Sequence, residues 1–257
     1  MNKLLKFENY RMKHIRKYIL YYVIYSIVYN NFFIMLKYKN KVLDITGEKY
    51  WKAFSSGALF IPLFITLLCG LLQNEGIKYK LHKLEIISGY SIQKIIISKS
   101  VLFIIYYCIY VNTLFISEFI VFSVINGIGS IDIFEFVAKN ITYVIIVFTV
   151  SIISNYIMYL VEDAVKGTVF TALLIIMCNF LIAIVMGFVM IKKPLIVENI
   201  QMFVATYLLE RCFEGGNHNE IPKLIFGAGI DMVMVVTVFT LISKILSCDK
   251  IEHIKKN

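Results

Sequence analysis

The sequence predicts an all-α protein that crosses a membrane several times, and its composition and its pattern of apolar runs carry that prediction. Of the 257 residues, 59% are hydrophobic and 17% are charged, and the mean hydropathy is +0.77. Soluble domains are about 45–50% apolar and about 25% charged, so this chain lacks the polar residues that a water-facing surface needs. Its long apolar runs also differ from the roughly ten-residue alternation of a membrane β-barrel.

Six of these runs are long enough to form transmembrane helices. The hydrocarbon core of a bilayer is about 30 Å thick and requires about 20 apolar residues per helix. A continuous helix also pairs its own backbone groups, which lipid cannot do. The expected spans are 18–36, 54–72, 101–124, 141–161, 168–191 and 224–246. They organise residues 1–257 as one transmembrane domain.

The positions of Lys and Arg predict that both termini are cytoplasmic. With the N-terminus inside, the inner segments carry 15 of these residues and the outer loops carry 10. Six of them lie in the first 17 residues, directly before the first span. Cytoplasmic loops carry the excess of positive charge in membrane proteins. The loops 37–53, 125–140 and 192–223 are therefore expected outside.

The longest inner connection, 73–99, has the pattern of a short amphipathic helix. Its apolar residues recur at helical spacing: Ile77, Leu81, Leu84 and Ile87. Charged side chains stand between them: Lys80, Lys83 and Glu85. Gly89 is expected just after the end of this helix, where a left-handed backbone favours glycine. Such a helix either rests on lipid headgroups or docks into a soluble partner.

Polar residues within the expected spans are the candidates for a substrate pathway. Glu118 and Asp231 each lie roughly 10 Å below the external boundary at 1.5 Å per helical residue, and Asn30 and Asn31 lie in the outer half of the first span. They could line a negatively charged outer cavity for a cationic amphipathic peptide. Alternatively, each could make a structural hydrogen bond between helices. That second role is the one expected for Asn155.

The chain lacks the motifs of several other functions. It contains no phosphate-binding loop of the Gly-x-x-x-x-Gly-Lys-Ser/Thr type and no His-Glu-x-x-His motif, so no catalytic residue is predicted. The residues Cys212, Glu214, His218 and Glu220 do not match the spacing of a zinc site. The net charge of +9 is spread over short loops. Membrane topology and attraction to lipid headgroups explain this distribution, and it does not indicate nucleic-acid binding.

Three segments resemble the ABC-2 type permeases, the membrane subunits of one class of bacterial ABC transporter. Residues 5–13 resemble the amphipathic elbow helix before the first span. The inner connection resembles the family's acidic residue, coupling helix, turn and basic residues, at Glu75, 77–88, Gly89-Tyr90-Ser91, Lys94 and Lys99. Residues 192–223 resemble its short external helices. The usual proline of the turn is replaced here by Ser88-Gly89-Tyr90.

The resemblance implies a permease subunit of the bacterial cell membrane that is not itself an enzyme. A separate ATPase subunit, acting as a dimer, would bind ATP and Mg²⁺. A second permease chain, identical or related, would complete the pathway. The ATPase contact would be made by Glu75, Leu81, Lys83, Leu84, Glu85, Gly89, Tyr90, Lys94 and Lys99. Size and hydropathy look most like the permeases of antimicrobial-peptide export and self-immunity, which implies a hydrophobic or amphipathic peptide or drug as substrate.

Two other classes of function remain open from the sequence. A membrane sensor, scaffold or channel would need no ATPase partner, although a channel usually shows a pore-lining pattern or a charged ring. A membrane-embedded enzyme would have to use Glu118 and Asp231, the one acidic pair within the spans, and no suitable nucleophile is found at their depth.

Overall fold

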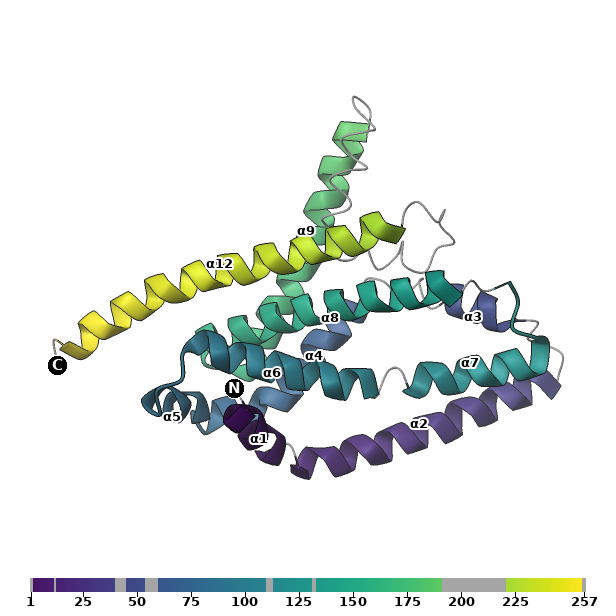
Figure 1. Cartoon of the computed structure of the whole chain (residues 1–257), viewed down its shortest axis with the longest axis horizontal. Coiled ribbons are helices and arrows are strands. Elements are labelled where there is room, and N and C mark those ends of the chain that lie inside the picture. The colour runs from purple at the N-terminus through teal and green to yellow at the C-terminus, as the bar shows by residue number, and fades with distance from the viewer. Residues whose placement is uncertain are drawn as a thin grey trace.

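The computed structural model describes residues 2–11, 13–39, 45–53, 60–109, 113–130, 133–190 and 221–255. Every element within these ranges is an α-helix, which confirms the predicted all-α class. The helices, shown in Figure 1, are α1 (Asn2–Arg11), α2 (Lys13–Lys39), α3 (Gly47–Ala53), α4 (Phe60–Lys78), α5 (Leu81–Ile87), α6 (Ile92–Tyr107), α7 (Thr113–Asn126), α8 (Ile133–Val161), α9 (Ala164–Met190) and α12 (Ile221–Lys255).

Two of the described helices contain a stretch long and apolar enough to cross a membrane. These stretches are Phe136–Val161 in α8 and Ile225–Ile242 in α12. Shorter apolar stretches occupy Val23–Leu36, Phe115–Asn126 and Ala164–Met177. The first, fourth and sixth predicted spans lie wholly within α2, α8 and α12. The six-span arrangement and the cytoplasmic position of both termini stay predictions.

The third predicted span covers parts of two described helices. The sequence predicts one helix over 101–124; α6 ends at Tyr107, α7 begins at Thr113, and residues 110–112 lie outside the described residues. Cys108 and Ile109 form a wider π-helical turn, and the Thr113 hydroxyl donates a hydrogen bond to the carbonyl of Ile109. Short π-helical turns of this kind occur within otherwise α-helical segments. The prediction of one continuous helix over 101–124 therefore stays a prediction.

The core of the molecule surrounds α8, which packs against α4, α6, α9 and α12. The side chains of Ile65, Val147 and Met158 have no exposed surface. At Gly167 a Cβ atom would lie 2.6 Å from the Cα atom of Met158. Only glycine therefore permits the observed approach of α9 to α8.

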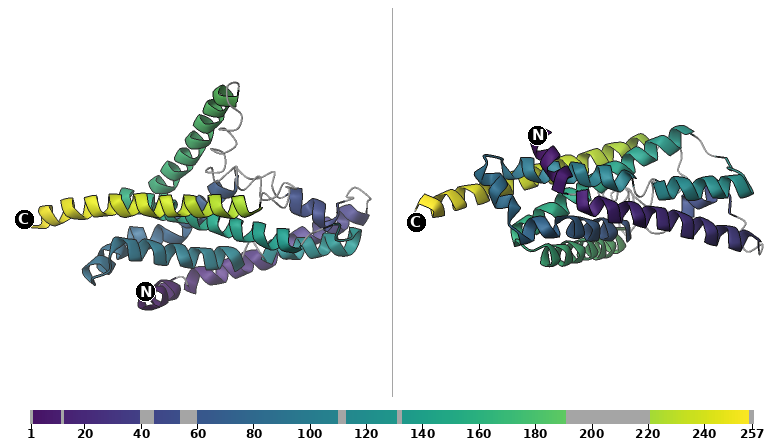
Figure 2. Two further views of the ribbon diagram at one scale, coloured as in Figure 1. Left: turned by 45° about the horizontal axis from the view of Figure 1, so that its top comes forward. Right: turned by 90° about the horizontal axis from the view of Figure 1, so that it is seen from below.

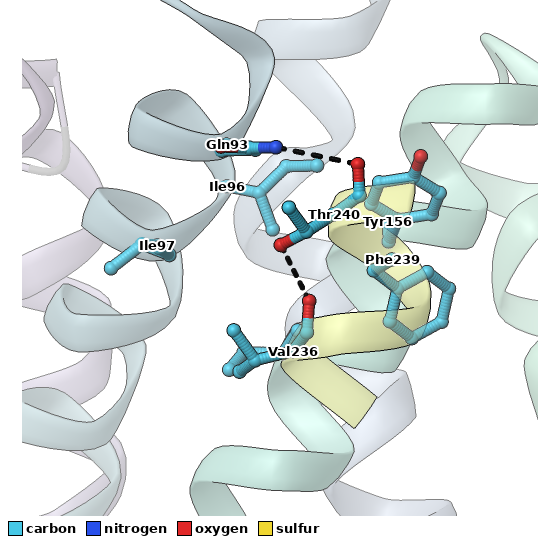
Figure 3. A pocket seen from close by; sticks show the side chains of 8 residues that line it. Gln93, Ile96, Ile97, Tyr156, Val236, Phe239 and Thr240 are labelled. Atoms are coloured by element: carbon cyan, nitrogen blue, oxygen red, sulfur yellow. Dashed lines mark hydrogen bonds between the residues drawn. The ribbon is translucent and has the colours of Figure 1, made fainter. Parts of the chain in front are cut away.

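The C-terminal helix α12 covers one side of this core. Figure 3 shows Phe239 of α12 against Tyr156 of α8, with ring centroids 4.3 Å apart. A cavity of about 30 Å³ lies beside this contact, between α6, α8 and α12. Two of its polar residues, Gln93 and Thr240, form hydrogen bonds within the wall. Gln93 Nε2 donates to the Thr240 carbonyl at 3.5 Å, and the Thr240 hydroxyl donates to the Val236 carbonyl at 2.6 Å.

The helices give the molecule two distinct ends. Helices α1 and α5 lie toward one end, past which the C-terminal part of α12 extends, and α3 lies at the other end (Figure 1). We call these the α5 end and the α3 end. The first half of α9 packs against α4 and α8, while its second half projects away from the other helices (Figures 1 and 2). The expected external helices within 192–223 fall almost entirely outside the described residues.

Candidate functional site

The helix of the inner connection is shorter than the sequence predicts. Periodicity predicts one helix over 77–88, but Ile77 belongs to the last turn of α4 and the separate helix α5 spans Leu81–Ile87. The break occurs at Lys80, whose φ of 52° and ψ of 32° place it in the left-handed region. L-residues rarely adopt this conformation, and a hydropathy pattern contains no signal for it. The prediction of a single helix starting at Ile77 was therefore wrong at its beginning.

The end of α5 matches the expectation for Gly89. Its φ is +86°, and no atom lies within 4 Å of a Cβ built there. The Gly89 N–H donates to the Ile86 carbonyl at 2.9 Å, and the Tyr90 N–H donates to the Glu85 carbonyl at 3.2 Å. This pair of bonds closes the helix in a Schellman motif. The expectation that Gly89 follows the last turn is confirmed.

The apolar residues of the predicted stripe separate into an inner and an outer group. Ile77 is buried against the bundle, with 8% of its surface exposed. Leu84 and Ile87 are 58% and 81% exposed. The side of α5 that faces the bundle instead carries His82 and Glu85, which are 3% and 6% exposed. Helix α5 therefore buries polar groups and presents apolar ones to its surroundings.

Glu85 belongs to a buried group of three charges that joins three helices. Lys99 of α6 places its Nζ atom 3.5 Å from Oε1 of Glu8 in α1 and 3.6 Å from Oε2 of Glu85 in α5. The exposed fractions of the side chains are 7% for Lys99, 1% for Glu8 and 6% for Glu85. We call these three residues the charge triad. It connects α1, α5 and α6 at the α5 end of the molecule.

Burial determines how the charge triad contributes to stability. Charges taken out of water lose hydration, so a buried ion pair can be close to neutral in net free energy. Removing one partner is different, because the remaining charge stays buried without compensation and typically costs about 3–5 kcal/mol. The charge triad therefore fixes the relative positions of α1, α5 and α6 even if its net stabilisation is small.

Further contacts join α5 to the end of α8 and to the turn that follows it. Lys83 donates to Glu162 at 2.9 Å, and both side chains are partly exposed. An exposed pair of this kind contributes at most about 1 kcal/mol. The rings of His82 and Tyr159 meet edge to face at 5.1 Å between centroids. Helix α5 thus touches two parts of the bundle, the charge triad on one side and the C-terminal end of α8 on the other.

The other residues expected at the ATPase contact lie around this centre. Glu75 and Lys94 are exposed, whereas Leu81 and Tyr90 are half-buried. The backbone N–H of Lys94 donates to the Ser91 hydroxyl at 3.4 Å, which caps the start of α6. Sequence reasoning missed Glu8 as a member of the site. Its signal was present, because Glu8 is the one acidic residue in the otherwise basic helix α1.

A second polar cluster lies toward the α3 end and contains two of the predicted pathway residues. Glu118 accepts a hydrogen bond on Oε1 from Asn30 Nδ2 at 2.6 Å, and on Oε2 from the Tyr50 hydroxyl. Tyr50 also stacks on Phe115 and Phe122, with centroids 5.6 and 4.9 Å apart. Burial, followed by the hydrogen bond to Glu118, raises the pKa of the Tyr50 phenol. Both oxygens of Glu118 are therefore engaged within the protein.

Hydrogen bonds of this second cluster and of the residues beside it hold α3 against α7. The Gly47 N–H donates to the Gly127 carbonyl at 3.1 Å, and the Glu48 N–H donates to the Ile128 carbonyl at 2.9 Å. Asn126 Nδ2 donates to the carbonyl of Ile45 at 2.8 Å. Tyr50 extends the same contact from α3 to Glu118 within α7. These bonds match the second role considered for Glu118, that of a structural hydrogen bond between helices.

The remaining predicted pathway residues, Asn31 and Asp231, form no hydrogen bond with this cluster among the described residues. Asp231 is partly buried on α12, whose main contacts are with α8. Asn31 follows Asn30 on α2, and its Oδ1 atom is buried without a hydrogen-bond partner in the described part of the chain. The structure thus brings Asn30 and Glu118 together and leaves Asp231 outside their group. No cluster of three or more His, Cys, Asp or Glu side chains suitable for a metal ion occurs among the described residues.

Comparisons with protein-family models, with curated proteins and with solved structures find no match for this chain. The sequence pattern and the geometry at the α5 end are therefore the basis for assigning a function.

Proposed function

We propose that the chain is the permease subunit of an ABC transporter, and that α5 is the element to which its ATPase subunit binds. The observation that carries the proposal is the orientation of α5. Its polar side is fixed inside the protein by Glu85, while Leu84 and Ile87 are exposed at the α5 end. Exposed apolar side chains on a short, well-anchored helix suit a groove on a soluble partner.

The proposed mechanism transmits motion from α5 into the longer helices. Closure of the ATPase dimer around ATP and Mg²⁺ would displace α5. Because Glu85 pairs with Lys99, that displacement would be transferred to α6 and, through Glu8, to α1. The Lys83–Glu162 pair would transfer it to the turn between α8 and α9. Packed helices with two discrete arrangements can convert such a local shift into alternating access.

The other parts of the proposal follow the sequence. ATP and Mg²⁺ bind to the partner ATPase, because this chain lacks a phosphate-binding loop. A second permease chain completes the pathway in a bacterial cell membrane, with both termini in the cytoplasm. The substrate class is a hydrophobic or amphipathic peptide or drug that is exported. We assign Glu118 to holding α3 on α7 rather than to the cargo, since both of its carboxylate oxygens are already bonded.

Purification of the tagged chain from its native membrane in mild detergent tests the docking assignment. We expect a protein with an ATP-binding phosphate loop to co-purify with the wild-type chain. The double variant Leu84→Asp/Ile87→Asp should lose that protein while keeping its own abundance in the membrane. Val165→Asp is the matched control, because Val165 is an apolar residue whose exposed fraction, 68%, lies between those of Leu84 and Ile87, and it lies in the first turn of α9 at the same end of the molecule.

The outcomes separate the proposal from its alternatives. Equal recovery of the ATPase with the wild type and with the double variant would reject α5 as the docking element. Recovery of the wild-type chain alone, at every detergent tried, would reject the permease function itself and favour a sensor, a scaffold or a channel.

A further inference from the structure

A polar cavity lies directly beneath α5, beside the charge triad. It has a volume of about 20 Å³ and is partly open, and its walls come from α4, α5, α6 and α8. Its polar lining consists of Gln73, His82, Lys99, Asn155 and Tyr159. The first four of these side chains are 3–7% exposed. Such a concentration of buried polar groups around one small space differs from the mainly apolar packing of the rest of the core.

Asn155 supplies the observation that indicates an occupant. Its Nδ2 atom donates a hydrogen bond to the Ser100 hydroxyl at 3.0 Å. The residue is only 5% exposed. Its Oδ1 atom is buried and has no hydrogen-bond partner among the described residues. Buried carbonyl oxygens are almost always bonded to protein or to ordered water. Asn155 is among the residues that line the cavity, so a donor within the cavity would satisfy this oxygen.

We propose that this cavity holds one ordered water molecule, which donates a hydrogen bond to Asn155 Oδ1. A cavity of about 10–15 Å³ or more can contain a water molecule if two to four polar partners surround it, and this one meets both conditions. Lys99, Gln73 and Tyr159 provide donors for the water oxygen. A monovalent anion fits less well, because the carboxylates of Glu8 and Glu85 lie close to the same ammonium group.

The neighbouring cavity in Figure 3 is a natural comparison. It is of similar size, about 30 Å³, and it also borders Ile96. Five of its eight lining residues are Ile, Val or Phe. Among the other three, Gln93 and Thr240 bond within the wall, and Tyr156 packs its ring against Phe239. Apolar cavities stay dry. The difference in polarity, rather than in volume, is what assigns water to the cavity beneath α5.

The proposed water molecule bridges α8 to α5 and α6 by hydrogen bonds. The direct contact of Asn155 reaches α6 at Ser100, whereas the water would connect Asn155 with the region of Lys99 and His82. Bound water is nearly as favourable as a direct hydrogen bond and can change its partners. Helix α5 could then shift relative to α8 while the Asn155 side-chain oxygen keeps a hydrogen bond to the water. The presence of the water itself does not depend on the proposed transport function.

Radiolytic footprinting of the purified full chain in ¹⁸O-labelled water tests this proposal. X-rays generate hydroxyl radicals from bound as well as bulk water, and these radicals label adjacent side chains. We expect His82 to be labelled several-fold faster than Met158, after correction for intrinsic reactivity. Met158 is the dry control, because it is fully buried and follows Asn155 by three residues in α8. In Asn155→Leu, which replaces the amide by an apolar group of similar size, labelling of His82 should fall to the Met158 level.

Two results would overturn the proposal. The cavity is dry if His82 in the wild-type chain is labelled no faster than Met158, and this comparison decides the matter even if Asn155→Leu does not fold. The water is not held by Asn155 if a folded Asn155→Leu variant keeps the wild-type labelling of His82. Asn155→Ser, which retains an oxygen acceptor and enlarges the cavity, should preserve the labelling.

Discussion

Replacement of Lys99 by methionine is the perturbation that most directly probes the charge triad. Methionine keeps much of the length and apolar volume of the lysine side chain but removes its charge. Glu8 and Glu85 would then remain buried near each other without a cation, since their exposed fractions are 1% and 6%. We expect Lys99→Met to destabilise the protein strongly and to release α1 and α5 from α6.

The distances give the magnitude of this effect. Each Lys99–carboxylate pair at 3.5–3.6 Å has an attraction of about 5 kcal/mol at an effective dielectric constant of about 20. Most of that attraction is offset by the hydration that the three groups have lost. The loss on removing one partner of a buried pair is about 3–5 kcal/mol. The triple variant Lys99→Met/Glu8→Gln/Glu85→Gln removes all three charges and should recover most of the loss.

The assay is thermal unfolding of the detergent-solubilised chain, followed by circular dichroism, together with the abundance of each variant in the membrane. Lys166→Met is the matched control, because Lys166 has a weak pair with Asp163 at 3.9 Å and is 75% exposed. It should change stability by less than about 1 kcal/mol. If Lys99→Met were as stable as this control, or if the triple variant were less stable than Lys99→Met, the assignment of a buried compensating triad would be incorrect.

Three further substitutions test local features by the same unfolding assay. Gly89→Ala should cost about 1 kcal/mol, because the left-handed backbone disfavours a Cβ atom; an unchanged midpoint would argue against the observed turn. Gly167→Ala should cost about 1–3 kcal/mol through overpacking against Met158, and wild-type stability would contradict the close helix approach. Tyr50→Phe should lose about 1.5–3 kcal/mol, the usual worth of a hydrogen bond to a charged group; no loss would mean that Glu118 does not need this donor.

The sequence predicts the features of this fold that depend on composition and periodicity. Long apolar runs indicate the helices, and the all-α class follows from them. Gly89 marks the end of α5 because its missing side chain has a direct backbone consequence. Asn155 was expected to bond between helices, and its contact with Ser100 confirms that expectation. In each case a local residue type carries the structural information.

Features that depend on contacts between distant segments could not be predicted from composition and periodicity. The pairing of Glu8 with Lys99 joins residues that are far apart in the chain, and periodicity within either segment does not reveal the other partner. The break at Lys80 depends on one backbone conformation that the residue type does not favour. The similar expected depths of Glu118 and Asp231 suggested a common site. Depth alone does not determine which helices are neighbours, and Glu118 bonds to Tyr50 and Asn30 instead.

Photo-crosslinking in intact cells is the most direct test of the claim that α5 is the docking element. A photoreactive amino acid replaces Ile87, which is 81% exposed, and in a separate variant it replaces Val124 of α7, which is 79% exposed. We predict that the Ile87 position crosslinks to a protein with an ATP-binding phosphate loop and that the Val124 position does not. Crosslinking of Ile87 to lipid alone, or of both positions to the same protein, would contradict this prediction.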